Sequence, residues 1–132
     1  MSREPQVPPR VTEPLQWEEV DSPPRYARTT DKPVQYAAVV DRNGTVLGYV
    51  WVNDEDDAAG WQYRRAGGDD AFNMGALWAA ELHEAKQQDL APSAALAKMT
   101  REYGPEDPSH IAPGSLTEAP SLQTVKDLAA KS

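Results

Sequence analysis

The chain has 132 residues, of which 39% are hydrophobic, and its 13 basic against 21 acidic side chains give a formal net charge of −8. This length fits a single domain. Phosphate backbones are bound by clusters of Lys and Arg, so the charge balance argues against a DNA- or RNA-binding protein. Cysteine is absent, which excludes disulfides, thiolate metal sites and thiol nucleophiles.

Prolines recur throughout residues 1–33. Each proline lacks an amide donor and biases the residue before it toward extended geometry, so we expect a flexible N-terminal arm. Two pieces of this arm, Leu15–Trp17 and Arg25–Tyr26, carry aromatic side chains that could pack back on the domain or on a partner. The sequence shows neither an apolar leader nor a run of about 20 apolar residues, and we expect a cytoplasmic protein.

A β-hairpin is the strongest local prediction. Residues 34–40 and 45–52 are rich in β-branched and aromatic side chains and flank Asn43-Gly44, a pair that favours tight turns. A two-residue turn would place Val40 opposite Leu47, Ala38 opposite Tyr49 and Tyr36 opposite Trp51. The alternative, a type I turn with Gly44 in a bulge, would slip this register by one residue.

An acidic segment, residues 53–60, follows the hairpin, and residues 34–90 as a whole hold ten acids against four bases. The next residues, Trp61–Arg64, place two aromatic side chains on one face of an extended strand. We therefore expect a third antiparallel strand, since an isolated hairpin is marginal in water.

Helices are expected in the second half of the chain. Gly67-Gly68 breaks the chain, after which Asp69 or Asp70 can cap a helix that runs to about Leu90. Its expected core-facing stripe consists of Phe72, Leu77, Trp78, Leu82 and Ala85.

A second, shorter helix begins at Pro92 and stops at Gly104-Pro105, with Leu96, Met99 and Tyr103 on its apolar side. Prolines punctuate residues 104–120, which we expect to be loop. Ser121 caps a last helix whose apolar stripe is Leu122, Val125 and Leu128.

The acidic run Asp54-Glu55-Asp56-Asp57 is the most conspicuous polar feature. Neighbouring carboxylates repel one another and a hard cation such as Ca²⁺ or Mg²⁺ relieves that repulsion. The spacing does not match a helix-loop-helix calcium loop, and acidic turns between strands are usually solvated. We therefore predict no metal and no cofactor here.

Catalytic motifs are missing. His83-Glu84 begins like a zinc-protease helix, but Gln87 stands where the second histidine ligand belongs, and the other histidine, His110, falls in the expected loop. No Gly-x-Ser-x-Gly elbow and no nucleotide-binding glycine loop is present. The sequence predicts no catalytic residue.

Aromatic side chains gather in the predicted sheet at Tyr49, Trp51, Trp61 and Tyr63. One face of the sheet must pack on the helix that carries Trp78. The other face is either open, as a binding surface for a protein or a flat ligand, or covered by one of the two shorter helices. An exposed edge strand could alternatively accept a strand from a partner.

Several strings resemble a group of small acidic proteins from high-GC bacteria to which no activity is assigned. They are Gly48–Asp54, Asp56–Gly60, Ala71–Asn73 and Pro113–Leu122. This resemblance covers about residues 36–128 and implies no catalytic or ligand-binding residue.

These observations predict one α+β domain over residues 34–130, with a three-stranded antiparallel sheet, one main helix and two shorter C-terminal helices. We expect a non-enzymatic protein-interaction or regulatory module that binds another protein and neither nucleic acid nor membrane. Its expected interaction residues are Tyr49, Trp51, Trp61, Tyr63, Asp54, Glu55, Asp56 and Asp57.

Two alternatives belong to other classes. The first is a small metal-dependent hydrolase in which Asp54, Asp56, Asp57 and His83 converge. The second is an immunity-type protein that neutralises a basic toxin with its acidic middle.

Overall fold

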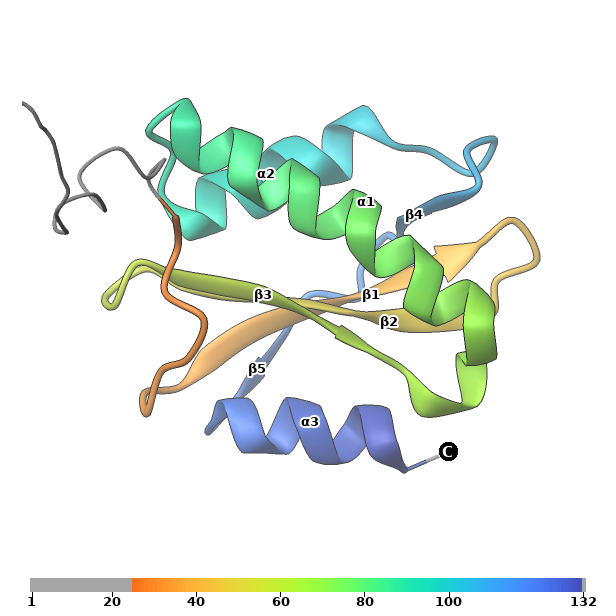
Figure 1. The fold of residues 1–132 in the computed structure, drawn as a ribbon, viewed down its shortest axis with the longest axis horizontal. Coiled ribbons are helices and arrows are strands. Elements are labelled where there is room, and N and C mark those ends of the chain that lie inside the picture. The colour runs from red at the N-terminus through yellow and green to blue at the C-terminus, as the bar shows by residue number, and fades with distance from the viewer. Residues whose placement is uncertain (1–24, 132) are drawn as a thin grey trace, which may run out of the picture.

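The structure is a computed structural model that describes residues 25–131. An open, five-stranded antiparallel sheet with strand order β3-β2-β1-β4, to which β5 adds on β1, is combined with three helices in an α+β fold (Figure 1). The elements in chain order are β1 (Val34–Asp41), β2 (Val46–Asn53), β3 (Ala58–Tyr63), a short 3-10 turn η2 (Arg65–Gly67), α1 (Gly68–Gln87), α2 (Pro92–Glu102), β4 (Ser109–Ile111), β5 (Thr117–Ala119) and α3 (Leu122–Ala130).

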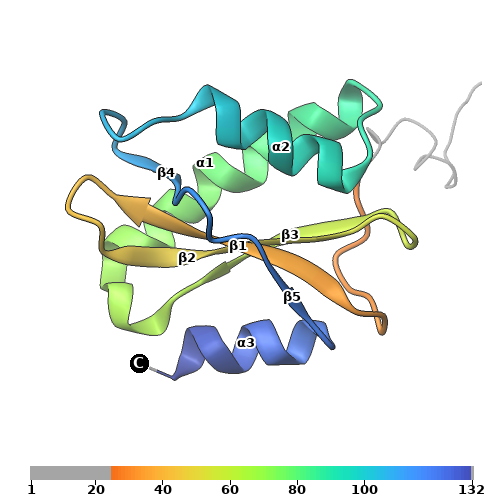
Figure 2. The same ribbon diagram turned by 180° about the vertical axis from the view of Figure 1, so that it is seen from behind.

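The sheet has two more strands than the sequence predicted, and both come from the expected loop 104–120. β4 pairs with the end of β1 and β5 with its start, on the same edge of that strand (Figure 2). Between them, Ala38 completes the edge by accepting a hydrogen bond from the Ala112 N–H and donating its own N–H to Ser115 Oγ. Strands of three residues are too short to show an alternating pattern of apolar residues, and the prolines in this segment predicted a loop instead.

The β1–β2 hairpin combines the two registers that the sequence left open. Gly44 has a φ of 83° and its N–H donates to the Asp41 carbonyl, as in a type I turn with a glycine bulge. Val40 consequently faces Val46, one residue away from its two-residue-turn partner. An irregularity between Val39 and Val40 then restores the register, so that Ala38 faces Tyr49 and Tyr36 faces Trp51.

Two apolar layers enclose the sheet: α1 and α2 cover one face, and α3 covers the other (Figures 1 and 2). The first layer includes Val39, Val50, Val52, Trp78, Leu82, Leu96, Met99 and Ile111. The second includes Val34, Tyr49, Trp51, Ala58, Leu122, Val125 and Ala129. Of the two alternatives for the second face of the sheet, the structure shows the covered one.

Glycines let both central tryptophans lie flat on the sheet. On the α1 side, the indole of Trp61 occupies the space in which a Cβ on Gly48 or on Gly75 would sit, at 2.5 and 2.7 Å from ring atoms. On the α3 side, the indole of Trp51 lies over Gly60 in the same manner, at 2.8 Å. The close packing of β2, β3 and α1 therefore depends on these three residues having no side chain.

The first helix differs from the prediction at both ends. Its N-cap position is Gly67, so that Asp69 and Asp70 are the second and third helical residues and neither one occupies that position. The helix ends at Gln87 instead of Leu90. Two of its expected core residues, Phe72 and Leu77, are exposed. The buried side is Ala71, Trp78, Leu82 and Ala85, because the neighbouring elements cover a narrower stripe than the apolar residues span.

The other helices agree with the sequence prediction. α2 has Pro92 in its first turn and buries Leu96 and Met99. α3 is capped by Ser121, whose side chain accepts from the Thr124 N–H, and it buries Leu122 and Val125. Within the described part of the chain, no helix is long and apolar enough to cross a membrane.

Residues 25–33 pack against the domain. Tyr26 is 7% exposed, and Ala27 exchanges hydrogen bonds with the carbonyl of Asp57 and the N–H of Ala59. The part of the arm that includes Arg25–Tyr26 therefore docks through Tyr26. The other expected docking piece, Leu15–Trp17, lies outside the described residues.

Candidate functional site

Only residues 54–57 of the expected acidic segment form a turn, because Ala58, Ala59 and Gly60 belong to β3. Within this turn the carboxylates separate toward different neighbours. Asp54 accepts from both the backbone N–H and the hydroxyl of Ser93, at 2.8 and 2.6 Å. Since Ser93 is the second residue of α2, Asp54 caps that helix from a distant part of the chain.

Asp56 binds in another direction, toward the N-terminal segment. It accepts from Lys32 Nζ and from the Thr30 hydroxyl, both at 2.6 Å. These hydrogen bonds, first that from Lys32 and then that from Thr30, lower the pKa of the Asp56 carboxyl below its ordinary value.

Asp57 completes the turn in a left-handed conformation, with a φ of 51°, and pairs with Lys86 of α1. The Lys86 Nζ also lies 5.5 Å from the centre of the Tyr26 ring. Tyr26 in turn donates its hydroxyl to the Leu90 carbonyl at 2.7 Å. Burial, followed by the nearby charge of Asp57, raises the pKa of Tyr26 to about 12.

The acidic turn therefore joins three elements, and its carboxylates do not converge. Within residues 25–131, no group of three His, Asp or Glu side chains could hold a metal ion. His83 lies on α1, where its Nε2 is 3.1 Å from Gln87 Nε2. His110 lies on β4, at the edge of the sheet opposite to β3. The structure does not bring together the carboxylates and His83 that the hydrolase alternative requires.

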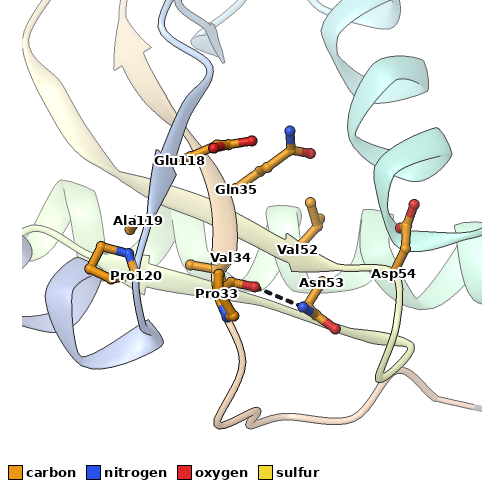
Figure 3. Close-up of a pocket in the computed structure, with 9 residues that line it drawn as sticks. All are labelled: Pro33, Val34, Gln35, Val52, Asn53, Asp54, Glu118, Ala119 and Pro120. Carbon is orange, nitrogen blue, oxygen red and sulfur yellow. Dashed lines mark hydrogen bonds between the residues drawn. The ribbon is translucent and has the colours of Figure 1, made fainter.

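A hollow of about 490 Å³ opens beside the acidic turn, where β1 begins and β2 and β5 end (Figure 3). Asn53 donates to the Pro33 carbonyl at its rim. Figure 3 shows Asp54 on the α2 side, set apart from Glu118 of β5. Because Ser93 already engages both oxygens of Asp54, this hollow presents no pair of free acids among the residues that the structure describes.

The four aromatic residues of the predicted site lie in different places. Tyr49 and Trp51 are buried beneath α3. Trp61 is partly buried against α1, and its indole N–H is enclosed without an acceptor among the described residues. Tyr63 is 40% exposed and meets Phe72 edge to face, with 5.8 Å between ring centres. They do not form one open aromatic surface.

A larger groove, of about 720 Å³, runs along the outer edge of β3. We call it the β3-edge groove. Figure 1 shows α1 on one side of β3 and α3 on the other. The residues that line the groove are Arg25, Tyr26, Arg28, Trp51, Ala59, Gly60, Trp61, Gln62, Ala79, Ala80, Leu82, His83, Leu122 and Lys126.

Backbone hydrogen-bonding groups of β3 point into this groove. The Arg64 N–H donates to Leu47 of the neighbouring β2, whereas the Ala59 N–H donates outward to Ala27. Because the backbone groups of successive residues alternate in direction along a strand, Trp61 and Tyr63 also face outward. Within residues 25–131, only Ala27 pairs with this edge, and it does so at the start of the strand.

The charge of the β3-edge groove is opposite to that of the chain. Among the residues that the structure describes, its charged side chains, Arg25, Arg28 and Lys126, are all basic, although the chain carries a net charge of −8. The α1 wall presents the small, exposed Ala79 and Ala80. This arrangement combines unpaired strand hydrogen-bonding groups, a narrow apolar wall and positive charge.

Sequence reasoning considered an edge strand that accepts a partner strand but did not locate the groove. The bases come from two separated segments, since Lys126 lies about a hundred residues from Arg25 and Arg28, so no cluster is visible in the sequence. The local signal was the presence of small residues on α1, at Gly75, Ala76, Ala79 and Ala80.

Comparison with known proteins finds no matching family model, curated protein or solved structure, so the resemblance to small acidic proteins of high-GC bacteria stays a prediction.

Proposed function

We propose that this protein is a protein-interaction module and that the β3-edge groove is where its partner binds. The observation that carries the proposal is the outer edge of β3 beyond Ala59, which has no pairing partner within residues 25–131 and lies in a groove between two helices. A strand edge with unpaired N–H and C=O groups is a template for pairing with another chain. Edges are usually blunted or covered; this one is flanked by two helices that leave it accessible.

The contact with Ala27 supports the proposal. Ala27 forms an isolated parallel bridge with Ala58. Its N–H donates to the Asp57 carbonyl, and its carbonyl accepts from the Ala59 N–H. An extended segment from outside the five-stranded sheet therefore already pairs with the first residues of the β3 edge. A partner strand would use the same kind of hydrogen bonds farther along, at Trp61 and Tyr63.

The two alternative functions depend on carboxylates that are free to act. Asp54, Asp56 and Asp57 are engaged by Ser93, Lys32 and Lys86 of the same chain. A basic toxin would have to displace these intramolecular contacts, and a metal-dependent hydrolase would have to reassemble them around an ion. The interaction at the β3-edge groove requires neither change, and we therefore prefer it.

Site-specific photo-crosslinking tests this function. A photoreactive residue at Ala79, in the groove wall, is compared with one at Ala94, another exposed alanine, which belongs to α2 and lies outside the groove. In cells that make the protein, we expect a discrete protein adduct from position 79 alone. A second change that fills the groove, Ala80→Phe, should abolish this adduct, whereas Ala97→Phe on α2 should not.

Two outcomes would contradict the proposal: adducts of equal intensity from both positions, or an adduct at position 79 that survives Ala80→Phe. Circular dichroism of each variant establishes that the substituted chains fold. A missing adduct at position 79 in folded protein would also count against the groove as the binding site.

A further inference from the structure

We propose that the partner presents an acidic segment in extended conformation, which adds as a strand to β3 at Trp61–Tyr63 and places its acidic side chains against Arg25, Arg28 and Lys126. This inference rests on the proposed function and specifies its ligand class. The occupant is a peptide segment with alternating apolar and acidic residues.

The backbone determines where such a strand pairs. The Ala59 N–H already donates to the Ala27 carbonyl. The groups that remain for a partner are the Ala59 carbonyl and the N–H and C=O groups of Trp61 and Tyr63. At a rise of about 3.3 Å per residue, this part of the edge accommodates roughly four partner residues. The recognised segment is therefore short.

The two walls of the groove select different side chains. A paired strand directs alternate side chains to the two faces of the sheet. Toward α1, they meet Ala79 and Ala80 and, at the far end, the exposed ring of Phe72 beside Tyr63. Toward α3, they meet Lys126. We accordingly expect apolar residues on the α1 side and acidic residues on the α3 side.

The positive charge of the groove is the reason that we expect the bound segment to be acidic. The charged side chains of residues 25–131 that line the groove are all basic, whereas the chain as a whole, with its net charge of −8, repels an acidic segment. The complementary charge of the groove favours binding there. A lysine-rich segment in the same position would place like charges side by side, which destabilises strand pairing.

The same charges disfavour a second copy of the chain as occupant. Pairing of two β3 edges about a two-fold axis would put the same patch of each copy at the interface. Arg25, Arg28 and Lys126 would then oppose their own counterparts. Inward-pointing charge of one sign is a device by which edge strands avoid pairing with themselves.

The test uses the ¹⁵N-labelled full-length chain and three synthetic peptides. The first alternates Val and Glu over seven residues, the second has Lys in place of each Glu, and the third is the Val/Glu peptide with N-methyl groups on alternate amides. We expect the Val/Glu peptide to shift the amide signals of Trp61 and Tyr63 and to bind at least ten-fold more tightly than the Val/Lys peptide. N-methylation on the pairing edge should abolish binding, because it removes the donors.

Charge reversal in the protein gives the matched control. The double variant Arg28→Glu, Lys126→Glu should reverse the preference, so that the Val/Lys peptide binds more tightly. The pair Arg101→Glu, Lys131→Glu makes the same change in net charge at exposed positions outside the groove. This control should keep the preference for the Val/Glu peptide.

Each of the following results would overturn the inference: equal affinity for the Val/Glu and Val/Lys peptides, binding that N-methylation leaves unchanged, or amide shifts that centre on β4 and β5. Protection of the Trp61 and Tyr63 amides from hydrogen exchange without peptide would show another occupant. A position-79 adduct combined with failure of every peptide would leave the interaction module standing and reject strand addition.

Discussion

Asp54 shows how a residue that suggests a ligand site can instead hold the fold together. The N-cap of α2 is Ala91, which has no side-chain acceptor and makes no cap hydrogen bond. Asp54 supplies the missing acceptor from the β2–β3 turn, through the N–H and hydroxyl of Ser93. The carboxylate thus replaces a local cap with one that also fixes the position of α2 against the sheet.

Replacement of Asp54 by Ala should lower the free energy of unfolding by about 1 kcal/mol, the usual effect of losing a helix N-cap. Urea denaturation measures this change. The matched control is Glu55→Ala, at the exposed neighbouring position, which should change stability by no more than about 0.5 kcal/mol. An equal loss in both variants would mean that general charge in the turn matters, and not the cap.

Gly75 lies in the middle of α1, where alanine would ordinarily stabilise a helix by about 1 kcal/mol. A Cβ at this position would lie 2.7 Å from Trp61 Nε1, and the indole cannot move away because Gly48 encloses its other end. Overpacking of this kind costs about 1–3 kcal/mol. We therefore expect Gly75→Ala to destabilise the protein by about 1 kcal/mol net and to change the tryptophan fluorescence.

The control for Gly75→Ala is Asn73→Ala, an exposed position on the same helix. This change gains helix propensity without the clash, so we expect it to be neutral or slightly stabilising by the same denaturation measurement. Stabilisation by Gly75→Ala would contradict the close approach of Trp61 to α1.

At the scale of the elements, the end of α1 has a conformation that its sequence does not favour. Asp89 has a φ of 64°, and the Leu90 N–H donates back to the Ala85 carbonyl, the hydrogen bond of a Schellman motif. Glycine is the usual residue at this left-handed position. A carboxylate there also faces the negative end of the helix dipole.

Asp89→Gly should therefore raise the melting temperature, with a gain of about 1 kcal/mol in unfolding free energy. Gln87→Gly, two residues earlier and inside the helix, should have the opposite sign and lose about 1 kcal/mol. If both changes destabilise the protein, Asp89 must contribute an interaction that outweighs its backbone strain.

The elements that the sequence predicted correctly are those with their own periodic signal. The β1–β2 hairpin, α2 and α3 carry alternating or helical patterns and caps, and they form within a few residues of the expected bounds. β4 and β5 exist only because β1 offers an edge to pair with. A strand that depends on a distant partner leaves little trace in three residues.

The same distinction applies to the candidate site. The acidic turn and the aromatic residues were visible in the sequence, but their partners were not: Ser93, Lys32 and Lys86 come from three separate parts of the chain. Tyr49 and Trp51 were covered by the last helix of the chain. One sequence indicates which side chains are candidates for a site, whereas the residues that these side chains contact depend on tertiary packing.

For the whole molecule, ionisable groups limit stability at both ends of the pH range. Burial, together with a hydrogen bond to Glu81, raises the pKa of Tyr103 to about 12, and that of Tyr26 is raised to about 12 as well. Their contribution is complete below pH 10.0, the ordinary tyrosine pKa, and is lost as the pH rises through 12. Asp56 has a lowered pKa, so its contribution is present above pH 3.8 and is lost as the pH falls through the lowered value.

Urea unfolding across pH 2–12 should therefore show a loss of stability in strong acid and another above pH 10. Tyr26→Phe should make the alkaline limb shallower, and Asp56→Asn should flatten the acid limb. Tyr63→Phe is the control, at an exposed tyrosine. An alkaline limb that is equally steep in Tyr26→Phe and in the parent chain would contradict the burial of that phenol.

The contacts between tryptophan and glycine on the two faces of the sheet impose a constraint on how this sequence can evolve. Trp61 requires Gly48 and Gly75, and Trp51 requires Gly60, so a single replacement of a glycine creates a clash and a single replacement of a tryptophan leaves a hole. A shorter aromatic or aliphatic residue at position 61 would first have to appear before larger residues are tolerated at 48 and 75. Homologous sequences should therefore change these positions together, on each face independently of the other.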